Sequence, residues 1–210
     1  MRGPGAGMEY VLVGAAIVLV VIFVVRARRS RLATVVIQDP RLGVLNLAGA
    51  SGEALAREDL GVLGPLFGTV QRSEGTPPAC DVLLVYCDFA SDGRLEGSVQ
   101  RLRDIIRDSG AAIVVLAKNH PGETYLAAVP RLDLGHANMV MTLDRKGSTL
   151  PAFLARLFRE MKRGVAMPIA WNQLAPQIPG ADHGDVPGAI FACSKSIAFG
   201  AAQPGVAERR

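Results

Sequence analysis

The stretch DVLLVYCDF, residues 81–89, decides the fold of this 210-residue chain. Its centre is an almost unbroken apolar run, which is typical of a strand buried on both faces of a parallel sheet. Two similar stretches follow, AAIVVLA at residues 111–117 and ANMVMTLD at residues 137–144. Because helical patterns separate them, the three stretches predict a βαβαβ unit with right-handed crossovers.

Helical periodicity marks the segments after each of these strands. Residues 98–110 place apolar side chains on one face, with Ser98 as the expected N-cap. The strongest pattern lies in residues 148–164, which predict a long amphipathic helix. Residues 167–177 predict a shorter helix in which Trp171 is a core anchor, with an exposed docking face as the alternative.

The remaining elements lie on both sides of this unit. Residues 33–40 and 41–49 each predict a strand, residues 51–70 a helix, and residues 71–78 a surface connection. Residues 189–200 predict one long strand or two short ones. Together these elements predict an α/β fold, a three-layer sandwich with a mainly parallel sheet and helices on both faces.

An uncharged apolar run, YVLVGAAIVLVVIFVV at residues 10–25, predicts a transmembrane helix. Because arginines mark the cytoplasmic side of a span, the segment that follows orients the chain, through Arg26, Arg28, Arg29 and Arg31. We therefore expect a single-pass protein of the inner or plasma membrane with a cytoplasmic C-terminal domain. A cleaved signal peptide is the alternative, but such a signal carries its charge before the apolar run.

The chain therefore divides into five predicted segments. These are a disordered tail (1–9), the transmembrane helix (10–25), a basic juxtamembrane segment (26–31), the α/β domain (32–200) and a flexible tail (201–210).

The net charge of +4 comes from the N-terminal segments. Residues 1–31 hold five Arg and one Glu, so the rest of the chain has equal numbers of basic and acidic residues. A neutral domain does not favour nucleic-acid binding. We expect the membrane and a protein as partners, with a homo-oligomer as a further option.

No pattern in the sequence predicts a metal ion or a cofactor. The histidines lack ligand spacing, and no Walker or Gly-x-Gly-x-x-Gly loop occurs. The cysteines are odd in number, which predicts small buried apolar side chains instead of disulfides, for Cys80, Cys87 and Cys193.

Polar residues follow each of the three central strands. Because the carboxyl ends of parallel strands meet at one edge, we expect a crevice formed by Asp88, Asp92, Lys118, Asn119, Asp144 and Arg145. Cys87 and His120 come from neighbouring strand ends and are the candidate nucleophile and base of a hydrolase. The alternatives are a plain buried cysteine and a structural ion pair of Lys118 with Asp144 or Asp88.

Over about residues 80–200 the order of these elements resembles the CHAT domain, a caspase-related α/β domain of many bacterial regulatory proteins. DVLLVYCDF resembles the family strand that ends in its catalytic histidine, and AAIVVLAKN the strand that ends in its nucleophilic cysteine. Asp88 and Asn119 stand at those positions, and neither supplies a thiolate or a suitable base. The resemblance implies a pseudo-peptidase that binds or assembles.

The sequence thus favours a membrane-anchored domain that acts as a non-catalytic interaction or scaffold module. Two alternatives stay open. One is a membrane-tethered cysteine hydrolase of caspase-like type, and the other is a small-ligand sensor that uses the strand-end crevice.

Overall fold

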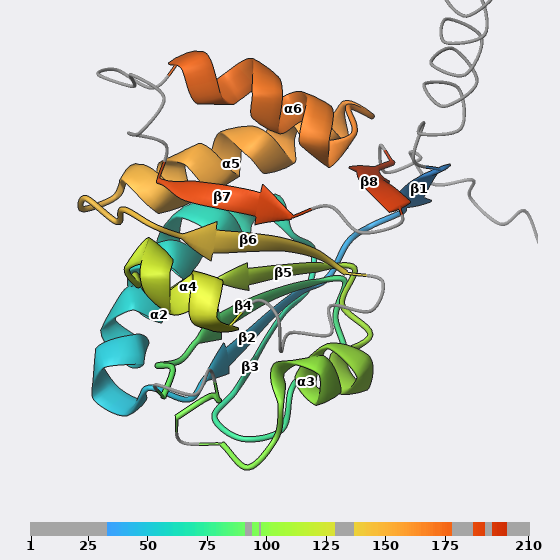
Figure 1. Ribbon diagram of the computed structural model, residues 1–210. Coiled ribbons are helices and arrows are strands. Elements are labelled where there is room, and N and C mark those ends of the chain that lie inside the picture. Colours follow the sequence, from blue (N-terminus) through green and yellow to red (C-terminus); the bar gives the residue numbers. More distant parts are fainter. Residues whose placement is uncertain are drawn as a thin grey trace, which may run out of the picture. The chain divides into compact units, whose positions relative to one another are not determined.

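The computed structural model describes residues 33–90, 94–96, 98–128, 137–177, 187–191 and 195–200. Its main sheet has six strands: β2 (Leu42–Asn46), β3 (Val70–Ser73), β4 (Val82–Tyr86), β5 (Ile113–Leu116), β6 (Asn138–Thr142) and β7 (Gly188–Phe191). The strand order is β3-β2-β4-β5-β6-β7 (Figure 1). Strands β2 to β6 are parallel, and β7 runs antiparallel to β6.

The order of the five parallel strands is that of a doubly wound sheet. Strand β2 pairs with β3 on one side and with β4 on the other, so the direction of winding reverses between β2 and β4. In such sheets, ligands and functional groups gather beyond the carboxyl ends of the strands. The topology therefore predicts that a functional site would lie at the carboxyl ends of β2, β4, β5 and β6.

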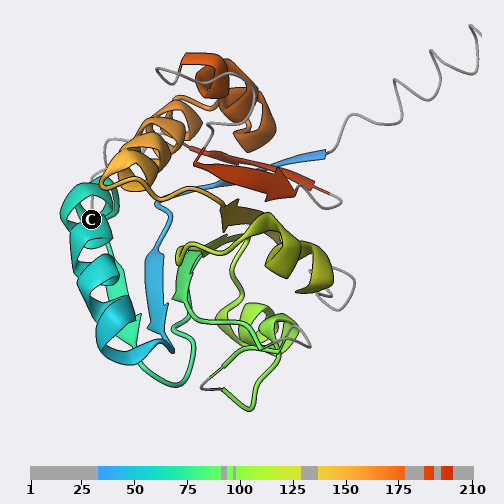
Figure 2. The same ribbon diagram turned by 60° about the vertical axis from the view of Figure 1, so that its left-hand side comes forward.

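Helices cover both faces of the sheet (Figure 2). One face carries α2 (Gly49–Leu63), α5 (Thr149–Lys162) and α6 (Met167–Leu174), and the other carries α3 (Leu102–Ser109) and α4 (Gly122–Ala128). Two short 3-10 helices follow α2 and α6, at Gly64–Leu66 and Ala175–Gln177.

Alternate residues of each central strand enter two different cores. In β4, Leu84 faces the core under α2 and α5, whereas Leu83 and Val85 face the core under α3. All five residues of β4 are buried. The covered faces explain the unbroken apolar run from which the α/β fold was predicted.

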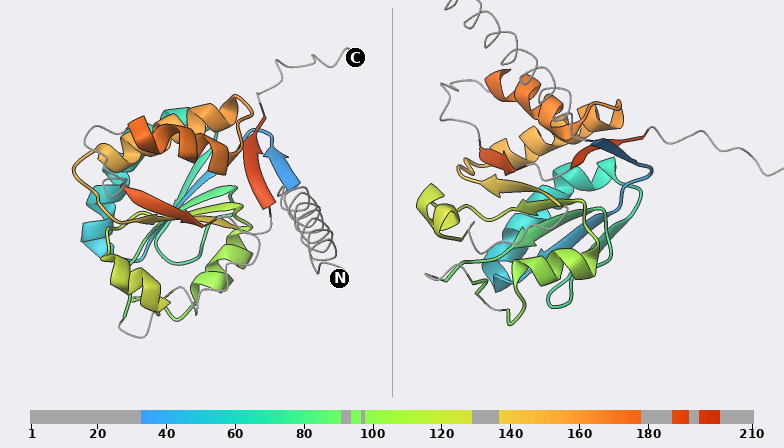
Figure 3. Two further views of the ribbon diagram at one scale, coloured as in Figure 1. Left: turned by 45° about the horizontal axis from the view of Figure 1, so that its top comes forward. Right: turned by 45° about the vertical axis from the view of Figure 1, so that its right-hand side comes forward.

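Strands β1 (Ala33–Ile37) and β8 (Lys195–Phe199) pair in a separate two-stranded sheet (Figure 3). Ile197 and Phe199 of β8 are buried in the core under α2 and α5. Of the two alternatives for residues 189–200, one long strand or two short ones, the structure has two short strands, and they belong to different sheets.

Two predicted boundaries were wrong. Residues 71–78 were expected to be a surface connection, but β3 occupies Val70–Ser73 at the edge of the sheet. The helix expected from Ser98 begins at Leu102 with Arg101 as its N-cap, and Val99 is fully exposed.

The N-terminal predictions fall on residues outside the described ranges. These are the tail at residues 1–9, the span at residues 10–25 and the basic segment at residues 26–31. Within the described ranges, no helix combines the length and the apolar character that a membrane crossing requires.

Candidate functional site

The carboxyl ends of β4, β5 and β6 bring most of the predicted polar residues to one edge of the sheet. They form two clusters that adjoin the two different cores. We call them the Asp88 cluster (Asp88, Lys118, His120, Phe89 and Tyr125) and the Asp59 cluster (Asp59, Tyr86 and Arg145).

An ion pair between Lys118 and Asp88 ties the end of β5 to the end of β4 in the Asp88 cluster. The predicted structural pairing of these two residues is confirmed. Their side chains are 23% and 37% exposed, so solvent screens the pair. An ion pair of this kind contributes at most about 1 kcal/mol to stability.

His120 is held in place by aromatic rings and by the backbone. Its ring lies edge-on to Phe89 and Tyr125, at centroid distances of 5.1 and 5.5 Å. Its Nε2 donates a hydrogen bond to the carbonyl oxygen of Cys87 at 2.9 Å and lies 3.9 Å from Asp88 Oδ1. Because a carbonyl only accepts, Nε2 carries the proton and is not free to act as a base there.

Cys87 offers no activated thiol. Its side chain is 1% exposed. Burial, and next the negative charge of Asp88, raises the pKa of the thiol to about 12. The nucleophilic form of cysteine is the thiolate, and the thiol of Cys87 stays protonated at neutral pH. The structure thus brings Cys87 and His120 together through a backbone carbonyl, without the geometry of a nucleophile and its base.

The Asp59 cluster is a buried network on the opposite side of the sheet edge. Arg145 binds Asp59 with two hydrogen bonds, from Nη1 to Oδ2 at 2.9 Å and from Nη2 to Oδ1 at 2.6 Å. The hydroxyl of Tyr86 donates to Asp59 Oδ2 at 2.6 Å, and Arg145 Nη1 also donates to the carbonyl of Ala117 at 3.2 Å. Burial, and then the charge of Asp59, raises the pKa of Tyr86. This network joins α2, the ends of β4 and β5, and the loop after β6.

Sequence reasoning placed Arg145 at the strand ends but missed its partner Asp59. The signal lies within α2, where Gly52, Ala56, Asp59 and Leu63 form the buried stripe. An acidic residue on the apolar face of a helix predicts a buried cationic or hydrogen-bonding partner. Arg145 supplies that partner, and its side chain is only 5% exposed.

The other predicted residues of the crevice do not converge on these clusters. Asp144 forms an ion pair with Lys146 at 2.8 Å, and Asn119 is exposed. Asp92 lies outside the described ranges, as does Cys193. Cys80 and Cys87 are free and buried, which confirms the prediction for these two cysteines.

The chemistry at this edge consists of paired charges, a protonated thiol and a histidine fixed by the backbone. In the part of the chain that the structure describes, no group of three or more His, Cys, Asp and Glu side chains could hold a metal ion. No protein-family description matches the sequence, and a search of curated proteins found no match.

Proposed function

We propose that the chain is a single-pass, membrane-anchored protein whose cytoplasmic α/β domain acts as a non-catalytic interaction module. The observation that supports this most is the mutual pairing of charges at the strand ends. Lys118 binds Asp88, Arg145 binds Asp59, and Asp144 binds Lys146. An acid, base or nucleophile must be free to approach a substrate, and these groups are occupied by one another.

The membrane part of the proposal rests on the sequence. Residues 10–25 are uncharged and apolar, and four arginines follow within six residues. An anchor confines the domain to a surface and raises the effective concentration of its partners without any new contact.

The CHAT-like resemblance forms part of the same proposal. Asp88 and Asn119 follow β4 and β5, which are neighbouring parallel strands. The two residues therefore lie at adjacent strand ends, which supports the proposal that they stand at the positions of the family's histidine and cysteine. With Asp88 held by Lys118 and with an amide at residue 119, the domain would be a pseudo-peptidase that binds instead of cutting.

Site-specific photocrosslinking tests the proposal. A photoreactive amino acid replaces the exposed Asn119 in the full-length chain, and the matched control replaces Arg103 on α3, whose side chain is 48% exposed. Intact cells are irradiated and the adducts are resolved by mass. We expect a discrete adduct from position 119 and none from position 103. Equal adduct patterns at the two positions, or no adduct from either, would refute an interaction at the strand-end edge.

A further inference from the structure

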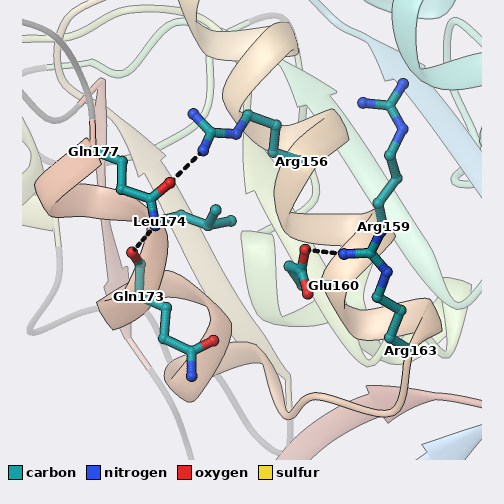
Figure 4. A pocket seen from close by; sticks show the side chains of 7 residues that line it. All are labelled: Arg156, Arg159, Glu160, Arg163, Gln173, Leu174 and Gln177. Carbon is teal, nitrogen blue, oxygen red and sulfur yellow. Dashed lines mark hydrogen bonds and ion pairs between the residues drawn. The ribbon is translucent and has the colours of Figure 1, made fainter.

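A groove of about 470 Å³ lies between the C-terminal half of α5 and the end of α6 with the 3-10 helix that follows it (Figure 4). The stacking of Trp171 of α6 edge-on against Phe153 of α5, at 4.8 Å between ring centroids, holds the two helices together. Leu174, which is 5% exposed, adds a buried apolar contact. The walls of the groove are therefore fixed by the core. Its lining consists of Arg156, Arg159, Glu160, Arg163, Gln173, Leu174 and Gln177.

The wall formed by α5 concentrates positive charge. Arg156, Arg159 and Arg163 follow one another at spacings of three and four residues, which places them along one side of the helix. Glu160 is the single acid of the lining, so the lining carries a net charge of two positive units. The opposite wall, formed by α6 and the 3-10 helix that follows it, is neutral and carries Gln173 and Gln177. The side-chain amide of Gln177 donates to the carbonyl oxygen of Gln173 at 2.8 Å and accepts from Arg156.

The three guanidinium groups differ in what they bind. Arg156 donates across the groove to Gln177 Oε1 at 2.7 Å, and Arg163 donates to Glu160 Oε1 at 2.5 Å. Figure 4 shows Arg159 stretched out with no such bond. Among the residues described, none forms a hydrogen bond or an ion pair with Arg159. An exposed side chain of this kind changes rotamer within nanoseconds, so Arg159 can turn toward a bound anion.

We propose that this groove binds a phosphate group. An arginine fork matches phosphate with two parallel hydrogen bonds, and a phosphate monoester carries close to two negative charges at pH 7. That charge balances the net charge of the lining, whereas a single carboxylate would leave half of it uncompensated. The donors would come from two arginines. The hydrogen bond to Gln177 holds the guanidinium of Arg156 in the groove, and Arg159 turns toward the phosphate. The proposal is independent of the function proposed for the strand-end edge.

Pyrophosphate titration of the full-length chain in a neutral detergent tests the proposal, with binding followed by calorimetry at low salt. The variants are Arg159→Ala, Arg159→Lys and, as the matched control, Arg103→Ala on the opposite face of the sheet. We expect saturable binding that weakens about tenfold in Arg159→Ala, because a charge-assisted hydrogen bond contributes about 1.5–3 kcal/mol. Arg159→Lys should bind with intermediate affinity, and Arg103→Ala should bind like the unmodified chain.

A second arm identifies the source of the phosphate. The same titration is repeated in nanodiscs of phosphatidylglycerol and of phosphatidylcholine. Weaker pyrophosphate binding in phosphatidylglycerol discs would assign the groove to an anionic lipid headgroup, and equal binding in both would assign it to a soluble phosphate compound. The proposal is overturned if pyrophosphate binding does not saturate, or if Arg159→Ala and Arg103→Ala reduce it equally.

Discussion

Asp59 is fully buried on α2 and is neutralised by the bidentate bond from Arg145. Two opposite charges removed from water are costly, and their attraction offsets that cost only while both are present. The network therefore does not indicate high stability. It fixes the position of the loop after β6 relative to α2 and so defines one side of the strand-end edge.

Removal of one partner from this network should greatly reduce the stability of the fold. We expect Asp59→Ala to destabilise the folded chain by about 3–5 kcal/mol, because the buried Arg145 loses its bidentate partner and keeps only the partly exposed Glu58 at 3.5 Å and the carbonyl of Ala117. Denaturant unfolding of the full-length chain in a neutral detergent measures the effect. The double variant Asp59→Leu with Arg145→Met should recover most of the loss. Asp108→Ala, at a side chain 37% exposed, is the matched control and should cost less than about 1 kcal/mol. Equal losses in Asp59→Ala and Asp108→Ala would contradict the assignment.

The two buried thiols predict a specific dependence on pH. Burial, and next a neighbouring aspartate, raises the pKa of Cys80 and of Cys87 from 9.0 to about 12. The folded state therefore favours the protonated thiols, and their contribution to stability is complete below pH 9 and is lost between pH 9 and 12.

Alkylation with iodoacetamide at pH 8 should consequently be slow for both cysteines. We expect rates at least about 100-fold below that of an unfolded peptide, because reaction requires local opening of the core. Peptide mass spectrometry quantifies each site, and unfolding in urea should restore the full rate. Rapid labelling of Cys87 in the folded protein, with a midpoint below pH 7, would instead reveal an activated thiol.

The contact of α2 with the sheet requires a residue without a side chain at position 52. A Cβ on Gly52 would lie 2.1 Å from Asn46 Oδ1 and 3.1 Å from the Cβ of Tyr86. Asn46 has little freedom to move, because its side chain bonds the amide of Ala48 and the carbonyl of Gly49. The helix therefore approaches β2 and β4 only because residue 52 is glycine.

Two glycine substitutions in this one helix should have opposite effects. Gly52→Ala should destabilise the fold by about 1–3 kcal/mol through overpacking. Gly61→Ala should stabilise it by up to about 1 kcal/mol, because nothing lies within 4 Å of the added Cβ and alanine favours a helix. Thermal unfolding of both variants provides the comparison. A Gly52→Ala variant as stable as the unmodified chain would show that α2 can shift away from the sheet.

The central strands and the long helix were predictable because each buries a continuous apolar pattern. Strand β4 is covered on both faces, so its sequence is an unbroken apolar run. Helix α5 is covered on one face, so its apolar residues recur with helical spacing. Strand β3 was missed because it lies at the edge of the sheet and exposes Val70, Gln71 and Arg72. Because its side chains are exposed, its sequence lacks the apolar pattern that would predict the pairing with β2.

The candidate site was predictable to the level of the strand ends but not to the level of its bonds. The parallel topology brought Asp88 and Lys118 together as expected. The topology did not predict that Arg145 lies in a different cluster from Asp88 and Lys118. The position of Arg145 depends on its bond to Asp59, which is 86 residues earlier in the chain. The topology also could not show that His120 bonds the carbonyl of Cys87 and not its thiol.

The proposed anchor predicts how the chain behaves in membranes. We expect the full-length chain to stay in the membrane pellet after washes with high salt and with alkaline carbonate, because residues 10–25 would span the bilayer. A variant that lacks residues 1–31 should appear in the soluble fraction. Release of the full-length chain by carbonate would show that the segment lies on the membrane surface or has been removed.

We propose that the domain is held at the membrane in order to bind a partner. The most direct test compares the crosslinking yield at position 119 in the full-length chain and in the variant without residues 1–31, at equal cellular concentrations. Confinement raises the effective concentration by orders of magnitude, so we predict a strong adduct in the full-length chain and a yield at least about tenfold lower in the truncated one. Equal yields from the two chains, or no adduct from the full-length chain, would contradict the claim.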